Sequence, residues 1–449
     1  MADAQFHATF LRDMAWRGLI HQCTDPLGLD RHLSATGAPR RLAYVGFDPT
    51  ASCLTIGNLV GIMNLARWQR AGHTPVVLMG GGTGLIGDPS GKSAERALLT
   101  PEEVAANVAS IRRIFARLVE LDPAGERGLM LDNAQWLGAL GYLGVLRGVG
   151  KHFSVNEMIK RDSVRARLAE RDQGISYTEF SYMILQAYDF AHMHEHHALS
   201  VQMGGSDQWG NIVSGIDLIR RRHAGPEPAE APQAFGLTWP LVTKADGGKF
   251  GKTESGAVWL LPPAPGEPAH QRTSAYAYYQ FWLNTADADA ARFLRTFTFM
   301  DHDEVAHLEH LTATDPAARA AQRALARAAT ALLHGAEAVG QAEAAAAALF
   351  SGDLASLSAQ ALDEALAAAP ATTHDRAGLD AGLPVLDLLP LTSLCKSRSE
   401  ARQLLQAGAV TVNGAKADPA RRLTLADLLH GRVIALRRGK KDWHVTRWA

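Results

Sequence analysis

Three polar side chains recur in "TEFSYMILQAYDF" (178–190) at a spacing that could build a binding site. Tyr182, Gln186 and Asp189 stand at positions i, i+4 and i+7, so a helix here carries a phenol, an amide and a carboxylate on one face. The residues around them are mostly apolar. Because an unpartnered buried polar group costs about 1–3 kcal/mol, this face needs a polar ligand in a cavity or contact with solvent. A solvated helix face is the alternative that these residues leave open.

Two further segments place polar groups where a strand is expected to end. "MGGSDQWGN" (203–211) puts Asp207 and Gln208 at a strand-to-helix junction, where simple capping of the helix is the alternative. "GGGTGLIGDPSGKS" (80–93) offers many backbone N–H groups and the carboxylate of Asp88. It is not a Walker phosphate loop, because that pattern needs glycine where this chain has Ile86. This segment could either approach a polar ligand closely or form a tight structural turn.

The corner "CLTIGNLVG" (53–61) resembles a phosphate site, yet it holds no Lys, Arg or His. It offers a close backbone approach at Gly57, the positive end of the following helix, and neutral donors from Thr55 and Asn58. The cations would have to come from another segment of the chain.

A glycine- and lysine-rich segment, "LVTKADGGKFGKTESG" (241–256), could supply those cations. It shows no periodicity, so we expect a mobile loop whose Lys244, Lys249 and Lys252 can close over phosphates. A merely solvated loop is the alternative. The cluster "HMHEHH" (192–197) fits no zinc spacing, so we interpret it as exposed histidines at a helix end, with no metal site.

Strands and helices alternate in the first half of the chain. Residues 41–47 and the stretch from 74 predict strands around a helix over 58–71, and Thr100 with Glu103 predicts the capping box of a further helix. Additional strands are expected at 127–133 and 198–205. This alternation predicts an α/β, doubly wound, parallel (Rossmann-like) sheet that binds ligands at its carboxyl edge.

The domain organisation follows from periodicity, composition and charge. We expect a catalytic domain over 1–240 with a mostly helical insertion at about 134–195, a lysine loop and an α-helical domain over 241–350, and a linker over 351–383. The last segment, 384–449, forms a small α+β module. It carries twelve Lys/Arg against five acidic residues, a balance of +7 that leaves −8 for the rest of the chain. Such a basic module favours RNA binding.

Composition indicates in which cellular environment the protein is expected to fold. At 449 residues and 47% apolar content the chain can bury a large core. No stretch reaches the roughly 18 uncharged apolar residues of a membrane span, and the N-terminus lacks an export signal. Cys23, Cys53 and Cys395 are isolated from one another, which fits a reducing cytoplasm.

Taken together, seven ordered segments resemble the bacterial-type tyrosyl-tRNA synthetases, which are class I aminoacyl-tRNA synthetases. They are "YVGFDPTASCLTIGN", "GGGTGLIGDPS", "KHFSVNEMI", "DQGISYTEFSYMILQAYDF", "GGSDQWGNI", "KFGKT" and "SRSEARQLLQAGAVTVNG". In this resemblance "LTIGN" stands in place of the HIGH motif and "KFGKT" in place of the KMSKS motif. The last segment resembles an RNA-binding module shared with a protein of the small ribosomal subunit.

The resemblance implies a two-step reaction. Tyrosine attacks the α-phosphate of ATP, which Mg²⁺ accompanies, to give tyrosyl-adenylate and pyrophosphate, and the tyrosyl group then passes to the 3′ end of tRNA(Tyr). No prosthetic group is implied, and the family is homodimeric. The implied tyrosine site comprises Tyr44, Asp88, Tyr182, Gln186, Asp189 and Gln202. The implied ATP contacts are Gly46, Asp48, Gly57, Asp207, Lys252 and Thr253, and the implied catalytic groups are Thr55, Asn58, Gln208, Lys249 and Lys252. Lys396, Arg398 and Arg402 are implied to meet RNA.

Two other functions remain open from the sequence. One is a related enzyme, a synthetase for tryptophan or a small-molecule adenylyltransferase, which Tyr44, Asp189 and the basic module disfavour. The other is a degenerate synthetase kept as an RNA-binding or regulatory protein. Thr55 favours this second alternative, because the family has histidine there and a hydroxyl cannot carry charge. The lysines of "KFGKT" argue against it.

Overall fold

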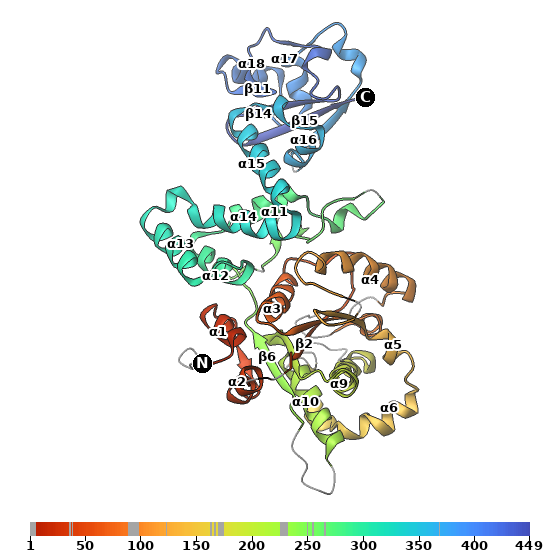
Figure 1. Ribbon diagram of the computed structural model, residues 1–449. Helices are drawn as coiled ribbons and strands as arrows, with labels where there is room; N and C mark the ends of the chain where they lie inside the picture. The colour runs from red at the N-terminus through yellow and green to blue at the C-terminus, as the bar shows by residue number, and fades with distance from the viewer. Residues whose placement is uncertain are drawn as a thin grey trace. The chain divides into compact units, whose positions relative to one another are not determined.

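The computed structural model describes residues 6–35, 37, 39–88, 98–122, 124–161, 164–165, 168, 175–224, 232–248, 250–253, 256–264, 266–367 and 369–449 (Figure 1). The chain divides into two compact units. The first comprises Met1–Thr273 and Thr285–Leu325, and the second comprises Ser274–Asn284 and Ala326–Ala449. The helical segment expected as one domain over 241–350 is therefore shared between the two units.

The first unit is built on a six-stranded sheet in the order β1-β6-β5-β2-β3-β4. Neighbouring strands from β6 to β4 run parallel, as the sequence predicts, whereas β1 pairs with β6 in antiparallel fashion. The strands are β1 (Gln22–Cys23), β2 (Leu42–Phe47), β3 (Thr74–Met79), β4 (Leu129–Asp132), β5 (Val201–Gly205) and β6 (Phe235–Trp239). Strands β2, β3, β4 and β5 match the expected strands, whereas β1 and β6 were not predicted.

Helices cover the sheet and carry its connections (Figure 1). Helix α3 (Leu59–Arg70) buries nearly all of its residues, including Trp68, and α4 (Pro101–Phe115) begins with the predicted Thr100–Glu103 capping box. Helix α9 (Tyr177–His197) contains the polar face of residues 178–190 and packs along α10 (Trp209–His223). The insertion before α9 contributes α5 (Ala134–Leu137), α6 (Tyr142–Gly148) and α7 (Val155–Ile159). The first unit also contains α1 (Thr9–Trp16), α2 (Pro26–Ser34), α12 (Asp287–Phe297) and α13 (His302–Thr314).

The second unit combines helices with a five-stranded sheet in the order β12-β11-β14-β15-β9. Its elements include α11 (Ala275–Leu283), α15 (Ala336–Ser351), α16 (Ala359–Ala365), α17 (Val385–Leu388), α18 (Arg398–Gln406), β9 (Ala371–His374), β11 (Val410–Val412), β12 (Ala415–Lys416), β14 (Val433–Arg438) and β15 (Asp442–Trp448), and α14 (Ala320–His334) precedes α15. The segment 351–383 is not a linker. Strand β9 pairs with β15 in parallel fashion, and Leu354 and Leu362 join the same apolar cluster as Val433. Its short elements lacked a recognisable period in sequence, which explains the error.

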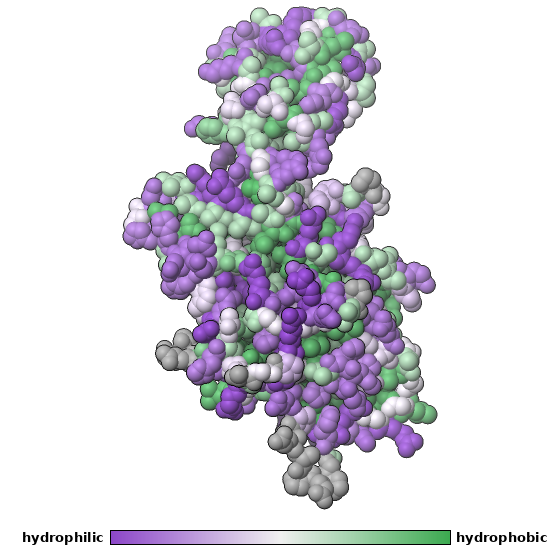
Figure 2. All heavy atoms as spheres, viewed as in Figure 1, coloured by the Kyte–Doolittle hydropathy of each residue, from purple (hydrophilic) through white to green (hydrophobic). Residues whose placement is uncertain are grey.

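The surface of the described chain is mixed in character. In the view of Figure 2, hydrophilic residues cover much of the molecule and apolar residues are scattered among them. No helix within the described ranges is long and apolar enough to cross a membrane.

Candidate active site

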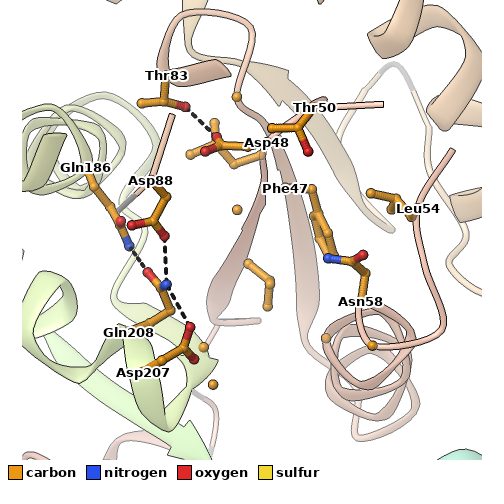
Figure 3. Close-up of a pocket in the computed structure, with 18 of the residues that line it drawn as sticks. Phe47, Asp48, Thr50, Leu54, Asn58, Thr83, Asp88, Gln186, Asp207 and Gln208 are labelled. Carbon is orange, nitrogen blue, oxygen red and sulfur yellow. Dashed lines mark hydrogen bonds between the residues drawn. The ribbon is translucent and has the colours of Figure 1, made fainter. Parts of the chain in front are cut away.

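A cavity of about 740 Å³ opens at the carboxyl edge of the first sheet. The ends of β2, β3 and β5, helix α9 and the 53–61 corner form its walls, so the segments that the sequence singled out meet in one place (Figure 3). Among the residues expected to act there, the lining includes Tyr44, Gly46, Asp48, Thr55, Gly57, Asn58, Asp88, Tyr182, Gln186, Asp189, Gln202, Asp207 and Gln208. The helix face of residues 178–190 therefore meets a cavity, and the alternative of a solvated face is wrong.

Two of these side chains, Tyr44 and Asp189, are almost fully buried. Tyr44 is 1% exposed and Asp189 2% exposed. Burial, together with the negative charge of Asp189, raises the pKa of the Tyr44 hydroxyl well above its usual value, as expected for neighbouring groups. Within the described part of the chain, neither the Tyr44 hydroxyl nor Oε1 of Gln202, its neighbour across the β2–β5 pair, has a hydrogen-bond partner. Because buried polar groups are normally hydrogen-bonded, we expect these two groups to bind a polar ligand.

Asn133 and Trp136 hold the Asp189 carboxylate in place. Asn133 Nδ2 donates to Oδ2 over 2.9 Å, and Trp136 Nε1 donates to Oδ1 over 2.7 Å. Burial raises the pKa of Asp189 to about 7, although these two hydrogen bonds lower it in part. The sequence analysis missed both donors. Their position directly after strand β4, at the carboxyl edge, was the signal that could have identified them.

A hydrogen-bonded network links the rest of the cavity wall. The Tyr182 hydroxyl donates to Asp48 Oδ2 over 2.8 Å, and the Thr83 hydroxyl donates to Oδ1 of the same carboxylate over 2.7 Å. Thr83 was not anticipated. Because Asp48 is held from two sides, its position in the cavity is fixed before any ligand arrives.

Gln208 forms the centre of the second half of this network (Figure 3). Its Nε2 donates to Asp88 over 2.8 Å and to Asp207 over 3.3 Å, while its Oε1 accepts from Gln186 over 3.2 Å. Neither the turn Ser206–Gln208 nor helix α10 has a side-chain cap, so the alternative of capping by Ser206 or Asp207 is wrong. Asp207 and Gln208 instead turn toward the cavity.

The cavity is acidic. Its described lining contains four carboxylates, from Asp48, Asp88, Asp189 and Asp207, but no Lys, Arg or His. Such a wall favours a ligand with a positive group and opposes a bare polyphosphate. Gly46, exposed at the cavity wall, leaves open space where a Cβ would stand, so a ligand can approach the backbone of β2 there.

The 53–61 corner differs from expectation in how its donors are used. The Thr55 hydroxyl donates to Asn58 Oδ1 over 3.0 Å, and the Thr55 backbone N–H donates to the same oxygen over 3.1 Å. The N–H groups of Asn58 and Leu59 donate to carbonyls within the corner. Thr55 and Asn58 thus form a preassembled neutral pair in the corner.

The lysine loop is described in part. Lys249 lies outside the described residues, as do the side chains of Lys252 and Thr253, whose backbones form strand β7 (Lys252–Thr253) against β8 (Gly256–Ala257). The corner and the loop nevertheless meet, because Ile56 N–H donates to Val258 O over 2.9 Å and Val258 N–H donates to Gly251 O over 2.9 Å. "LTIGN" and "KFGKT" are thus adjacent in space.

The histidine cluster lies in the last turns of α9 but is not uniformly exposed. His192 is half-buried and stacks on Trp136, with ring centroids 4.5 Å apart, and His196 lies 4.3 Å from His192. No group of three or more His, Cys, Asp or Glu side chains that could hold a metal occurs in the described ranges.

The residues expected to meet RNA lie at the start of α18 in the second unit. Lys396, Arg398 and Arg402 are exposed, and Arg398 pairs with Asp387 over 2.9 Å. Ser397 caps the helix by accepting from Glu400 N–H, which fixes the direction in which this basic turn leaves the core.

Comparisons with known proteins identify the class of protein. A sequence model described as "tRNA synthetases class I (W and Y)" matches residues 39–351, and one described as "Tyrosine--tRNA ligase SYY-like C-terminal domain" matches residues 363–446. A truncated mitochondrial tyrosyl-tRNA synthetase from Aspergillus nidulans has a similar structure, with a TM-score of 0.65 and 29% identity over 76% of this chain and 94% of that one. The chain is therefore a class I aminoacyl-tRNA synthetase.

Curated relatives show to which family of class I synthetases the chain belongs. The tyrosine–tRNA ligase of Roseiflexus castenholzii is 47% identical over 98% of this chain and 99% of its own length, and that of Geobacillus stearothermophilus is 45% identical over the same shares. The chain belongs to the tyrosine–tRNA ligase family, and it is an enzyme of the ligase class. These matches give no support to the alternative of a degenerate, purely RNA-binding relative.

Proposed function

We propose that this chain activates tyrosine with ATP and transfers the tyrosyl group to tRNA(Tyr). The observation that carries the proposal is the pairing of an unpartnered, buried Tyr44 hydroxyl with the Asp189 carboxylate in one cavity. A phenolic hydroxyl can donate to Asp189 and accept from Tyr44, so both groups gain a partner when tyrosine binds. Phenylalanine would leave the Tyr44 hydroxyl unpaired and would leave Asp189 with only its hydrogen bonds from Asn133 and Trp136.

The proposed roles of the other residues follow from their positions around the cavity. Asp88, Tyr182 and Gln186 offer oxygen atoms to the α-amino group, and Gln202 supports this end of the site. Gln208 lies where it can meet the tyrosine carboxylate or the α-phosphate, and Gly46, Asp48, Gly57 and Asp207 would contact the nucleotide and its ribose. Thr55, Asn58, Lys249, Lys252 and Thr253 would surround the phosphates.

We propose that activation proceeds without a protein nucleophile. Both substrates are held so that the tyrosine carboxylate can attack the α-phosphate directly, which turns a bimolecular encounter into a step within one complex. Negative charge grows on the phosphate oxygens, and the loop lysines and neutral corner donors would stabilise it there. The four carboxylates of the cavity make a bare ATP unfavourable, which supports Mg²⁺ as its companion. Bound Mg²⁺ would neutralise the phosphates and orient them.

We propose that the second unit contributes RNA contacts and that the enzyme works in the cytoplasm, where ATP and tRNA are present. The +7 balance of residues 384–449, with Lys396, Arg398 and Arg402 on an exposed turn, suits phosphate contacts. Since each phosphate contact releases counterions, affinity for tRNA should fall steeply as salt rises.

We propose a homodimer formed through the helical insertion of the first unit. Exposed apolar side chains gather there, with Tyr142, Leu143 and Leu146 on α6 and Val155 on α7 at 43–74% exposed, while the hydroxyls of Tyr142 and exposed Tyr177 lie 3.4 Å apart. Such a patch on a folded domain marks a contact surface. Leu143→Asp is expected to give a monomer in sedimentation at micromolar concentration, whereas Leu391→Asp, an exposed leucine of the other unit, should remain dimeric. A dimeric Leu143→Asp protein would contradict this interface.

The raised pKa of Asp189 predicts a pH-dependent affinity for tyrosine. The ionised carboxylate is the form that accepts the phenol's hydrogen, so binding favours ionisation and releases a proton below the free-protein pKa of about 7. Affinity should therefore rise by up to about tenfold per pH unit toward pH 7 and level off above it. Trp136→Phe removes a donor to Oδ1 and should move the inflection to higher pH. Equilibrium dialysis with labelled tyrosine measures both effects, and a dissociation constant independent of pH would refute the assignment.

The complete reaction is tested by charging tRNA. Purified protein, ATP, Mg²⁺, labelled tyrosine and a bacterial tRNA pool should yield acid-precipitable tyrosyl-tRNA, and tryptophan or phenylalanine should not be incorporated. Binding of tRNA without any charging would instead support a degenerate, RNA-binding protein.

A further inference from the structure

Phe250, the second residue of "KFGKT", lies against helix α12 of the same unit. Its ring stacks on Phe297, with centroids 5.1 Å apart and planes inclined by 15°, and it meets the edge of Phe293 at 5.1 Å and 62°. Phe297 and Phe293 are 0% and 3% exposed, so the ring of Phe250 rests on a rigid part of the core. An aromatic residue in a glycine- and lysine-rich loop is thus anchored.

The residue after Phe250, Gly251, packs against the 53–61 corner. Gly251 has a φ of +76°, and a Cβ there would approach Ile56 Cγ2 to 2.6 Å, so only glycine fits between the loop and the 53–61 corner. The backbone from Gly251 through Val258 to Ile56 is hydrogen-bonded. The Phe250–Gly251 pair is therefore held between α12 and the corner that carries Thr55.

Helix α12 is itself fixed near both ends. At its start, both carboxylate oxygens of Asp289 accept from Ala245 N–H over 3.1 Å, which ties down the beginning of the loop. At its end, Arg67 Nη2 donates to the carbonyls of Thr296 over 2.7 Å and Thr298 over 3.0 Å. Arg67 is 3% exposed and belongs to α3, the helix that follows directly after the corner. α12 thus links the base of the loop to the helix of the corner.

We propose that Phe250 is a positioning residue for the activation step: its ring, held by Phe293 and Phe297, fixes the backbone of Gly251 and Lys252 beside the 53–61 corner. This inference rests on the proposed function. A cation stabilises the developing phosphate charge only from hydrogen-bond distance, and a misplacement of about 1 Å can cost on the order of a hundredfold in rate. Prior ordering of the loop at Phe250 means that less ordering is needed in the transition state.

The test compares Phe250 variants in tyrosine-dependent ATP–pyrophosphate exchange. Equilibrium dialysis counts the tyrosine-binding sites, and kcat is expressed per site, so loss of folded protein does not affect it. Phe250→Ala should lower kcat by about 10- to 100-fold while the KM for tyrosine stays within about twofold. Phe250→Tyr, which keeps the ring, should restore kcat to within about threefold. Phe297→Leu should also lower kcat. In the double variant with Phe250→Ala, the two losses of kcat should not multiply, because both changes break the same contact.

Phe10→Leu is the matched control. Phe10 is 1% exposed and packs edge-on against Trp68 at 4.8 Å, and it is not among the described residues that line the cavity. It should lower the unfolding temperature and leave kcat per site within about twofold. An unchanged kcat in Phe250→Ala, or a loss that appears wholly in tyrosine binding, would overturn the inference. Absence of exchange in the parent protein would instead overturn the proposed function.

Discussion

Asp189→Ala is expected to abolish most of the enzyme's discrimination between tyrosine and phenylalanine. In the parent protein phenylalanine would leave the buried Tyr44 hydroxyl unpaired and would offer no donor to the buried Asp189 carboxylate, which keeps only Asn133 and Trp136. Rejection of phenylalanine by about 10⁴–10⁵ is the magnitude known for this enzyme family. Without the carboxylate the cavity loses its acceptor for the phenol, and the ratio of kcat/KM for the two amino acids should fall by at least about a hundredfold.

The ratio is the appropriate quantity because the variant is also less stable. Removal of the carboxylate leaves Asn133 Nδ2 and Trp136 Nε1 without their buried acceptor, so the folded fraction falls. That loss affects both amino acids equally and cancels in the ratio. Asp303→Ala, which removes a fully exposed carboxylate, should leave the ratio unchanged. If Asp189→Ala rejects phenylalanine as strongly as the parent does, Asp189 does not recognise the phenolic hydroxyl of tyrosine.

Lys252→Ala is expected to have the second large effect, on the rate of activation. The described cavity wall offers four carboxylates and no cation, so the proposed mechanism assigns charge compensation at the phosphates to Mg²⁺ and the loop lysines. Loss of one donor to a developing oxyanion costs about 10²–10³ in kcat in a protease, and a similar loss is expected here. Rapid-quench measurement of tyrosyl-adenylate formation gives this rate directly.

The comparison variants make the Lys252 experiment specific. Lys160→Ala removes a surface lysine that pairs with Glu157 and should leave the rate unchanged. Tyrosine affinity of Lys252→Ala should stay within about twofold of the parent, because Lys252 acts on phosphates. A Lys252→Ala enzyme with an unaltered activation rate would contradict the role of the loop.

Regular periodicity allowed much of the fold and half of the site to be predicted from sequence. The apolar runs of β2 and β3 and the caps of α4 are local signals, and Tyr182, Gln186 and Asp189 share a face because helix geometry requires it. These features depend on neighbours in the chain. The short strands β1 and β9 depend on pairing with distant partners, so no local pattern revealed them.

The missed site residues were missed for a related reason. Asn133 and Trp136 act on Asp189, more than fifty positions away, and Phe250 acts through a helix that begins at Asp287. Such roles arise from tertiary contacts, which the spacing of residue types does not encode. The Thr55–Asn58 pair is a different case, because this local hydrogen bond, three positions apart, replaces the separate donors expected from the sequence.

The most direct measurement of the central claim is amino-acid-dependent exchange of labelled pyrophosphate into ATP. It reports reversible adenylate formation in this cavity and needs no tRNA. The account predicts rapid exchange with tyrosine, exchange slower by about 10⁴–10⁵ in kcat/KM with phenylalanine, the family's own reference value, and none above background with tryptophan. Background exchange with every amino acid, or faster exchange with tryptophan than with tyrosine, would contradict it.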